Sequence, residues 1–104
     1  MDASLLYITA QNSEEARTLG TALLEDRLVA CVNIVPGIQS MYWWNGSIAS
    51  DTEVLCIAKT KTSLVPEVIA KVKTLHSYAC PCVVALPIIG GNAEFLAWIA
   101  HETR

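Results

Sequence analysis

The densest group of potential ligand atoms lies in the segment His76-Ser77-Tyr78-Ala79-Cys80-Pro81-Cys82. Because Cys80 and Cys82 are two residues apart, their thiols would face the same side of an extended segment, and His76 could fold back over them. Thiolate and imidazole together suit soft metals such as Cu(I) or Zn(II). The spacing is a weak signal, because no second C-x-x-C half completes a tetrahedral site. Two interpretations stay open: a soft-metal site, and packed thiols beside a histidine bonded to the backbone.

The other two cysteines lie earlier in the chain, where Cys31 opens a strand-like run and Cys56 sits among apolar neighbours. Free cysteine is among the most buried residue types, so both favour the core. The first residues show neither a basic segment nor a small-residue cleavage site. We therefore expect a cytoplasmic protein whose four cysteines are reduced thiols.

Motifs for catalysis are missing from the sequence. It contains no Ser-His-Asp order, no phosphate-binding glycine loop and no H-E-x-x-H helix. Gly90-Gly91 is more simply the start of a helix, and His101 is expected to be solvated. Asp51 and Glu53 share one face of a strand without an acid/base partner, which indicates solvated edge charges. We predict that the protein is not an enzyme and requires no cofactor.

Composition excludes two classes of partner and favours another. The net charge is −3 and the seven Lys and Arg residues are scattered, which argues against nucleic acid. No apolar run approaches the roughly 20 residues of a membrane span. The chain is 53% hydrophobic and only 16% charged, whereas ordinary soluble domains are about 25% charged. Such a chain is expected to bury apolar surface in a homo-oligomer.

The first half of the 104 residues reads as a strand, a helix and a long hairpin. Residues 5–8 form a short apolar run typical of a central strand. Asn12 caps a helix that continues to about Leu28, with Glu15 in a capping-box position. Asn45-Gly46 predicts a type I′ turn between arms 30–46 and 47–60. Pro36-Gly37 predicts a bulge in an edge strand.

The second half predicts a helix capped by Thr62 or Ser63, with Pro66 in its first turn. A strand at 83–86 and a helix capped by Asn92 follow. The order β-α-β-β-α-β with a C-terminal helix predicts one α+β domain over residues 1–104. Its fold would be a ferredoxin-like sandwich with both helices on one face of an antiparallel sheet.

The hairpin is the most informative feature, because arms of more than ten residues exceed the usual strand length of about five or six. It overhangs a domain of this size and needs a partner, most simply another copy of the chain. Tyr42, Trp43 and Trp44 at its tip could anchor an oligomer interface or form a ligand-stacking platform; we favour the interface.

Five stretches of the chain, in order and at family spacing, resemble the CutA divalent-cation-tolerance proteins. They are Arg27-Leu28-Val29-Ala30-Cys31-Val32-Asn33-Ile34, Tyr42-Trp43-Trp44-x-Gly46-x-Ile48, Glu53 with Lys59-Thr60, His76-x-Tyr78-x-x-Pro81, and Phe95-Leu96-x-Trp98-Ile99. The resemblance covers essentially the whole chain. It implies a ferredoxin-like fold in a tight homotrimer, a function in the response to metal ions, and copper binding as attributed to some members.

The resemblance also implies site residues. The cysteine matching Cys31 and the histidine matching His76 are suggested metal ligands in the family. Glu53, Lys59, Tyr78 and Trp98 match positions expected near an inter-subunit cleft, where Lys59 would make an ion pair across subunits. The trimer would look like that of the PII signalling proteins without their nucleotide-binding loop. An alternative function is therefore a PII-like sensor that binds a small metabolite in these clefts.

The chain departs from the family motif, which is close to H-P-Y-E-x-P. Ser77 replaces the proline, Ala79 replaces an acidic or amide residue, and Phe95 stands where tyrosine is usual. Cys80 and Cys82 add thiols that the family does not require. If the protein binds a metal, we expect Cu(I) or another soft or divalent ion held by some of Cys31, His76, Cys80 and Cys82.

Overall fold

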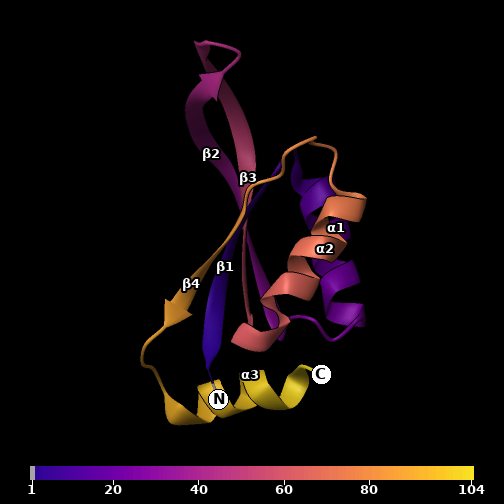
Figure 1. Cartoon of the computed structure of the whole chain (residues 1–104), viewed down its shortest axis with the longest axis vertical. Helices are drawn as coiled ribbons and strands as arrows, with labels where there is room; N and C mark the ends of the chain where they lie inside the picture. The colour runs from indigo at the N-terminus through magenta and orange to yellow at the C-terminus, as the bar shows by residue number, and fades with distance from the viewer. Residues whose placement is uncertain (1) are drawn as a thin grey trace.

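The computed structural model describes residues 2–104 and shows a four-stranded sheet with three α-helices (Figure 1). The elements in chain order are β1 (Ala3–Ala10), α1 (Ser13–Glu25), β2 (Cys31–Trp44), β3 (Ser47–Lys61), a 3-10 turn (Thr62–Leu64), α2 (Val65–Leu75), β4 (Val83–Ile88) and α3 (Ala93–Glu102). The expected β-α-β-β-α-β order and the C-terminal helix are confirmed.

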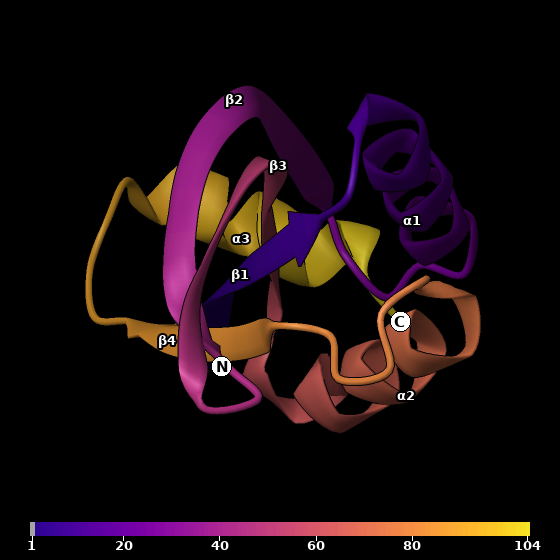
Figure 2. The same ribbon diagram turned by 90° about the horizontal axis from the view of Figure 1, so that it is seen from above.

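The sheet has the strand order β2-β3-β1-β4, and every neighbouring pair is antiparallel. Both α1 and α2 cover one face of it, as Figure 2 shows from above. Between helices and sheet lies the hydrophobic core, to which β1 contributes Leu6 and Ile8 and β3 contributes Cys56. In both strands alternate residues face the helices, because successive side chains of a strand point to opposite faces.

The hairpin forms as its sequence predicts. Asn45 and Gly46 have φ values of 49° and 82°, as a type I′ turn requires, and Trp44 pairs with Ser47. The register between β2 and β3 shifts between Val35 and Ile38, so Pro36-Gly37 is a β-bulge. Since β2 lies at the edge of the sheet, Pro36 removes no hydrogen bond from a central strand.

Half of this hairpin projects beyond the rest of the sheet. β1 pairs with β3 from Val54 to Lys61, so residues 47–53 of β3 pair with β2 alone. Seven residues of strand span about 23 Å. The molecule is accordingly elongated, with extents of 44 × 25 × 22 Å and a radius of gyration of 14.1 Å, against about 13 Å for a compact domain of this length.

The first helix ends three residues earlier than expected. Its start is confirmed, because the Asn12 side chain accepts a hydrogen bond from the Glu15 amide. It stops at Glu25, where Arg27 adopts a left-handed φ of 57°. The amides of Arg27 and Leu28 donate to the carbonyls of Leu24 and Leu23, which is a Schellman motif. The apolar spacing continues through Leu28 because Leu28 packs in the core from beyond the helix.

The expected cap of the second helix is wrong, whereas that of the third is confirmed. α2 follows a 3-10 turn and has no side-chain cap; Thr62 instead shares a hydrogen bond with Ser4 of β1. Asn92 accepts from the Glu94 amide at the start of α3. α3 lies across the end of the sheet away from the hairpin tip (Figure 1), with Ile99 buried.

The face of the sheet opposite α1 and α2, here termed the open face, carries apolar side chains. Its exposed or partly exposed apolar members on the four strands are Leu5, Tyr7, Val35, Leu55, Ile57, Val84 and Leu86. Val84 and Leu86 are 51% and 49% exposed. No helix within residues 2–104 has the length and apolar character needed to cross a membrane.

Candidate functional site

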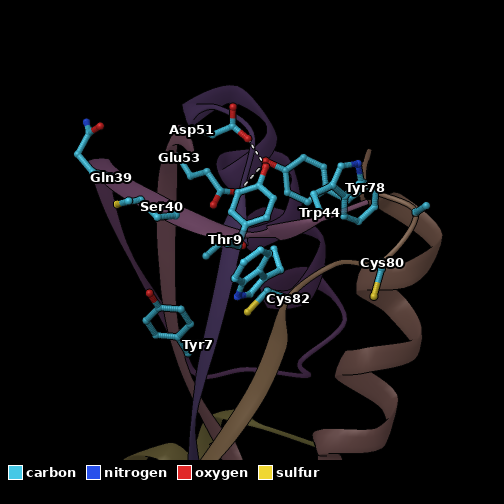
Figure 3. Close-up of a pocket in the computed structure, with 14 residues that line it drawn as sticks. Tyr7, Thr9, Gln39, Ser40, Trp44, Asp51, Glu53, Tyr78, Cys80 and Cys82 are labelled. Atoms are coloured by element: carbon cyan, nitrogen blue, oxygen red, sulfur yellow. Dashed lines mark hydrogen bonds between the residues drawn. The ribbon is translucent and has the colours of Figure 1, made fainter. Parts of the chain in front are cut away.

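A hollow of about 680 Å³ opens where the projecting hairpin meets the segment before β4. Its floor is Tyr7 and Thr9 of β1, and its walls come from the hairpin and from the segment that follows α2. The full lining is Tyr7, Thr9, Gln39, Ser40, Met41, Tyr42, Trp43, Trp44, Asp51, Glu53, Tyr78, Ala79, Cys80 and Cys82. The hollow exists because β1 stops at Ala10 while the hairpin continues beyond it. Figure 3 shows Trp44, Glu53 and Tyr78 gathered around this space.

Glu53 and Tyr78 form the central polar contact of the hollow. The Tyr78 hydroxyl donates to Glu53 Oε2 at 2.7 Å, and Glu53 is only 7% exposed. Burial raises the pKa of the Tyr78 phenol, and the Glu53 carboxylate raises it further. The expectation that Glu53 is a solvated edge charge is therefore wrong, since the segment before β4 covers it.

A second phenol–carboxylate pair lies beside the first. The Tyr42 hydroxyl donates to Asp51 Oδ2 across the β2–β3 ladder. This hydrogen bond raises the pKa of the Tyr42 phenol, with smaller contributions from burial and the charges of Asp51 and Glu53. Both tyrosines thus stay neutral beside two acidic side chains, and the hollow carries net negative charge.

His76 holds the segment before β4 against β1. Its side chain is fully buried, and Nδ1 accepts from the Tyr78 amide at 3.1 Å. Nε2 lies 2.7 Å from the Thr9 carbonyl oxygen, so it carries the proton and donates there. The rings of His76 and Tyr78 also pack with centroids 4.6 Å apart. The histidine therefore positions Tyr78 for its contact with Glu53.

Glu15 at the start of α1 supports the same segment. Its two carboxylate oxygens accept from the Gln11 and Ser77 amides, each at 2.9 Å, and Oε1 lies 3.8 Å from His76 Nδ1. Burial by itself raises the pKa of this carboxyl, but hydrogen bonds from Gln11 and Ser77 outweigh it, so the pKa of Glu15 lies below its ordinary value. Glu15 thus links the start of α1 to the segment before β4.

The four residues expected as metal ligands do not come together within one chain. Cys31 is the first residue of β2, where it pairs with Lys59 of β3. This strand lies at the opposite edge of the sheet from β4. Cys31 lies roughly 20 Å from Cys82 by strand spacings. His76 does not fold over the cysteines, because both of its ring nitrogens bind backbone groups. Within residues 2–104, no three His, Cys, Asp or Glu side chains are arranged to hold a metal ion.

Cys80 and Cys82 remain as two thiol side chains that line the hollow. Cys80 is exposed and Cys82 is partly exposed, and Figure 3 shows their side chains at separate points of the segment. Cys56 has the structural role expected of it, since it is buried in the core and burial raises the pKa of its thiol.

The expected cleft residues divide into two groups in the single chain. Glu53 and Tyr78 are bonded at the hairpin end, whereas Lys59 lies six residues further along β3. Its ammonium donates to Asn33 Oδ1 at 2.9 Å and lies 6.0 Å from the centre of the Phe95 ring, which packs on Trp98. Only a second copy of the chain could bring both groups into one cleft.

The aromatic tip of the hairpin is exposed in the chain. Trp43 and Trp44 are 73% and 56% exposed, and Tyr42 is 38% exposed. Trp44 also lines the hollow, so the interface and ligand-platform interpretations both fit its position.

Sequence reasoning missed the roles of Asp51, Thr9 and Glu15 at this site. Asp51 had a signal, because it precedes Glu53 by two residues on one strand face. No local pattern indicates the contact of His76 with the Thr9 carbonyl or that of Ser77 with Glu15. Each contact joins residues more than 60 positions apart in the sequence.

Replacing His76 by phenylalanine should lower the free energy of unfolding by about 2 kcal/mol or more, because the Thr9 carbonyl and the Tyr78 amide would lose their partner. Chemical denaturation at one protein concentration measures the effect. His101→Phe, at an exposed position of α3, is the matched control and should change stability little. Equal stability of H76F and wild type would contradict the positioning role of His76.

The contact between Tyr78 and Glu53 should make stability depend on alkaline pH. Because the folded-state pKa of Tyr78 is raised, its stabilisation is complete below about pH 10 and is lost as the pH rises toward the folded value. The stability gap between wild type and Tyr78→Phe should therefore stay constant up to about pH 9 and shrink as the pH rises above about 10. Glu53→Gln should weaken this dependence. A gap that is constant with pH would count against the contact.

Comparison with known proteins gives one family throughout. Residues 4–102 match the family model described as CutA1 divalent ion tolerance protein. The divalent-cation tolerance protein CutA of Thermus thermophilus is 48% identical over 95% of this chain and 96% of its own length. A chloroplastic CutA 1 protein of rice is 45% identical over 96% of this chain, which spans 56% of that relative.

Solved structures agree with the sequence matches. The crystal structure of CutA1 from Oryza sativa superposes with a TM-score of 0.97 at 43% identity, covering 100% of this chain and 95% of that one. The Thermus thermophilus CutA1 structure gives a TM-score of 0.96 at 46% identity, covering 98% of this chain and 99% of that one. The overhanging hairpin and the loop at His76 and Tyr78 are thus part of a shared architecture, and this chain belongs to the CutA divalent-cation tolerance family.

Proposed function

We propose that this protein acts as a non-catalytic homotrimer of ferredoxin-like subunits in the tolerance of divalent metal ions. The observation that carries the proposal is the apolar open face of the sheet beside a hairpin that outgrows it. The link to divalent cations comes from the relatives, which are named divalent-cation tolerance proteins.

The assembly follows from the surface that one chain leaves uncovered. Tyr7, Val84 and Leu86 present apolar side chains with no helix over them. Burying apolar surface contributes about 25 cal/mol per Å². Three open faces packed around an axis would bury these residues, and the hairpin tips with Tyr42, Trp43 and Trp44 would reach neighbouring subunits.

Metal binding is proposed at Cys80 and Cys82. Thiolates suit Cu(I), whereas Mg²⁺ and Ca²⁺ require oxygen ligands. Cys31 and His76 would join such a site only if another subunit supplied Cys31 and the His76 ring gave up its backbone partners. We therefore propose a site of low ligand number that takes up copper or a similar soft ion weakly, with a Kd just below about 1 µM.

The compartment proposed for this protein is the cytoplasm, where its four cysteines stay reduced. Relatives differ in this respect, since the rice protein is described as chloroplastic and a structure from Archaeoglobus fulgidus as periplasmic. The names of the relatives describe tolerance and no reaction, which supports a non-catalytic role.

A second candidate function is supported by the hollow itself. Its volume lies within the range of about 300–1,000 Å³ that ligand pockets occupy, and buried Glu53 projects into it. The protein would then act as a PII-like sensor for a small metabolite at each inter-subunit cleft, with Trp98 of a neighbouring copy completing the site and Lys59 making an ion pair across subunits.

The trimer predicts a sedimenting mass three times the 11.3 kDa of the chain at micromolar concentration. Leu86→Glu would place a charge in the buried centre of the assembly and should shift the mass toward the monomer. Leu75→Glu, at a similarly exposed leucine that ends α2, should leave the mass unchanged. Trp44→Ala should weaken assembly by about 2 kcal/mol if Trp44 is an anchor. A wild-type mass of 11.3 kDa would refute the trimer.

For the metal site, titration of the reduced protein with Cu(I) against a competing chelator should show binding with a Kd below about 1 µM. The double change Cys80→Ser with Cys82→Ser should abolish it, and Cys31→Ser, the thiol control, should not. Binding should weaken as pH falls, because thiols must lose protons to coordinate. Equal affinity in the double variant would reject these ligands, and weaker wild-type binding would reject the site.

A further inference from the structure

The lining of the hollow has a chemical character that identifies a class of ligand. Two carboxylates, Asp51 and Glu53, lie in its wall, and the lining contains no Lys, Arg or His. Glu53 is nine-tenths buried and gives one oxygen, Oε2, to Tyr78. A carboxylate accepts hydrogen bonds at both oxygens, so the other remains available to a ligand. The site therefore attracts positive charge.

Aromatic rings also line the hollow. Trp44 and Tyr78 both line this space (Figure 3), and so do Tyr7 and Tyr42. The faces of aromatic rings attract a cation, most strongly for tryptophan. The hydrogen bond to Asp51 raises the pKa of Tyr42, and burial with the hydrogen bond to Glu53 raises the pKa of Tyr78. The neutral phenols therefore add ring surface without adding charge.

A bare metal ion fits this lining poorly. Each carboxylate already accepts a phenol hydrogen bond, and residues 2–104 provide no group of three His, Cys, Asp or Glu ligands. Hard divalent ions require six or more oxygen ligands. An organic cation instead spreads one charge over an apolar body and gains from ring faces and carboxylates together.

We propose that the hollow binds a small organic ammonium ion, with its charge facing Asp51 and Glu53 and its alkyl groups against Trp44 and Tyr78. This inference rests on the small-molecule cleft proposed above and gives that cleft a ligand class. A neighbouring subunit in the trimer would deepen the hollow and leave its acidic wall as the recognition element.

Calorimetric titration with choline tests the proposal against a neutral carbon isostere, 3,3-dimethyl-1-butanol. Choline should bind about tenfold more tightly than the isostere, as a desolvated cation–π and carboxylate contact allows. Asp51→Asn and Glu53→Gln should each reduce choline affinity severalfold. Glu25→Gln removes an exposed carboxylate at the end of α1 and should leave affinity unchanged. Sedimentation of each variant confirms that the assembly is intact.

The alternatives give distinct results. Equal binding of choline and the isostere, or unchanged affinity in both acidic-wall variants, would overturn the cation assignment. Preferential binding of the anionic 3,3-dimethylbutyrate would also overturn it while leaving the small-molecule cleft in place. Absence of heat with all three probes up to about 50 mM, where millimolar binding is visible, would overturn the cation assignment and the small-molecule cleft together.

Discussion

The structure depends on one mismatch of length: β3 is fifteen residues long, whereas its neighbour β1 has eight. Backbone groups of residues 47–53 pair with β2 on one side only, and an unpaired strand edge needs another partner. The segment before β4 approaches part of that edge. Its Tyr78 hydroxyl reaches Glu53 at the point where β1 ends. The hollow, its acidic wall and the projecting aromatic tip all follow from this difference.

Polar contacts hold the loop that covers Glu53 in place. His76 is buried and uses both ring nitrogens on backbone groups, and Glu15 holds the Ser77 amide. Buried polar groups of this kind destabilise the fold when they lack a hydrogen-bond partner. When they are hydrogen-bonded, they fix the position of the segments that they join. No buried side-chain nitrogen or oxygen within residues 2–104 lacks a hydrogen-bond partner. The placement of Tyr78 is therefore determined by a connected network from α1 to β3.

Carboxylate and thiol side chains line the same hollow but suit different ligands. Cys80 and Cys82 supply soft sulfur donors to its lining, whereas the carboxylates of Asp51 and Glu53 attract positive charge. The two phenols share the acidic side chains in hydrogen bonds, which keeps both tyrosines neutral. The proposed metal binding and the proposed small-cation recognition thus draw on separate groups of the site, and substitutions in one group need not affect the other.

Local patterns in the sequence were sufficient for much of the fold. Asn45-Gly46 predicts its turn because both residues tolerate positive φ, and Pro36-Gly37 predicts the bulge for a related reason. Asn12 and Asn92 predict helix starts through contacts that span two or three residues. The end of α1 was predicted less well, because Arg27 takes a left-handed conformation that favours glycine.

The site was predictable only in part, because its contacts join distant elements. Glu53 and Tyr78 were expected near one cleft, but nothing local indicates that they bond directly or that Glu53 is buried. Cys31 and His76 were expected to ligate a metal, yet strand order places Cys31 at the far edge and backbone groups occupy His76. The sequence by itself determined the strands, the hairpin turn and the starts of the first and third helices, since these arise from nearby residues. Only the tertiary structure decided which donors meet, because pairing across a sheet brings together residues whose separation in sequence carries no information about contact.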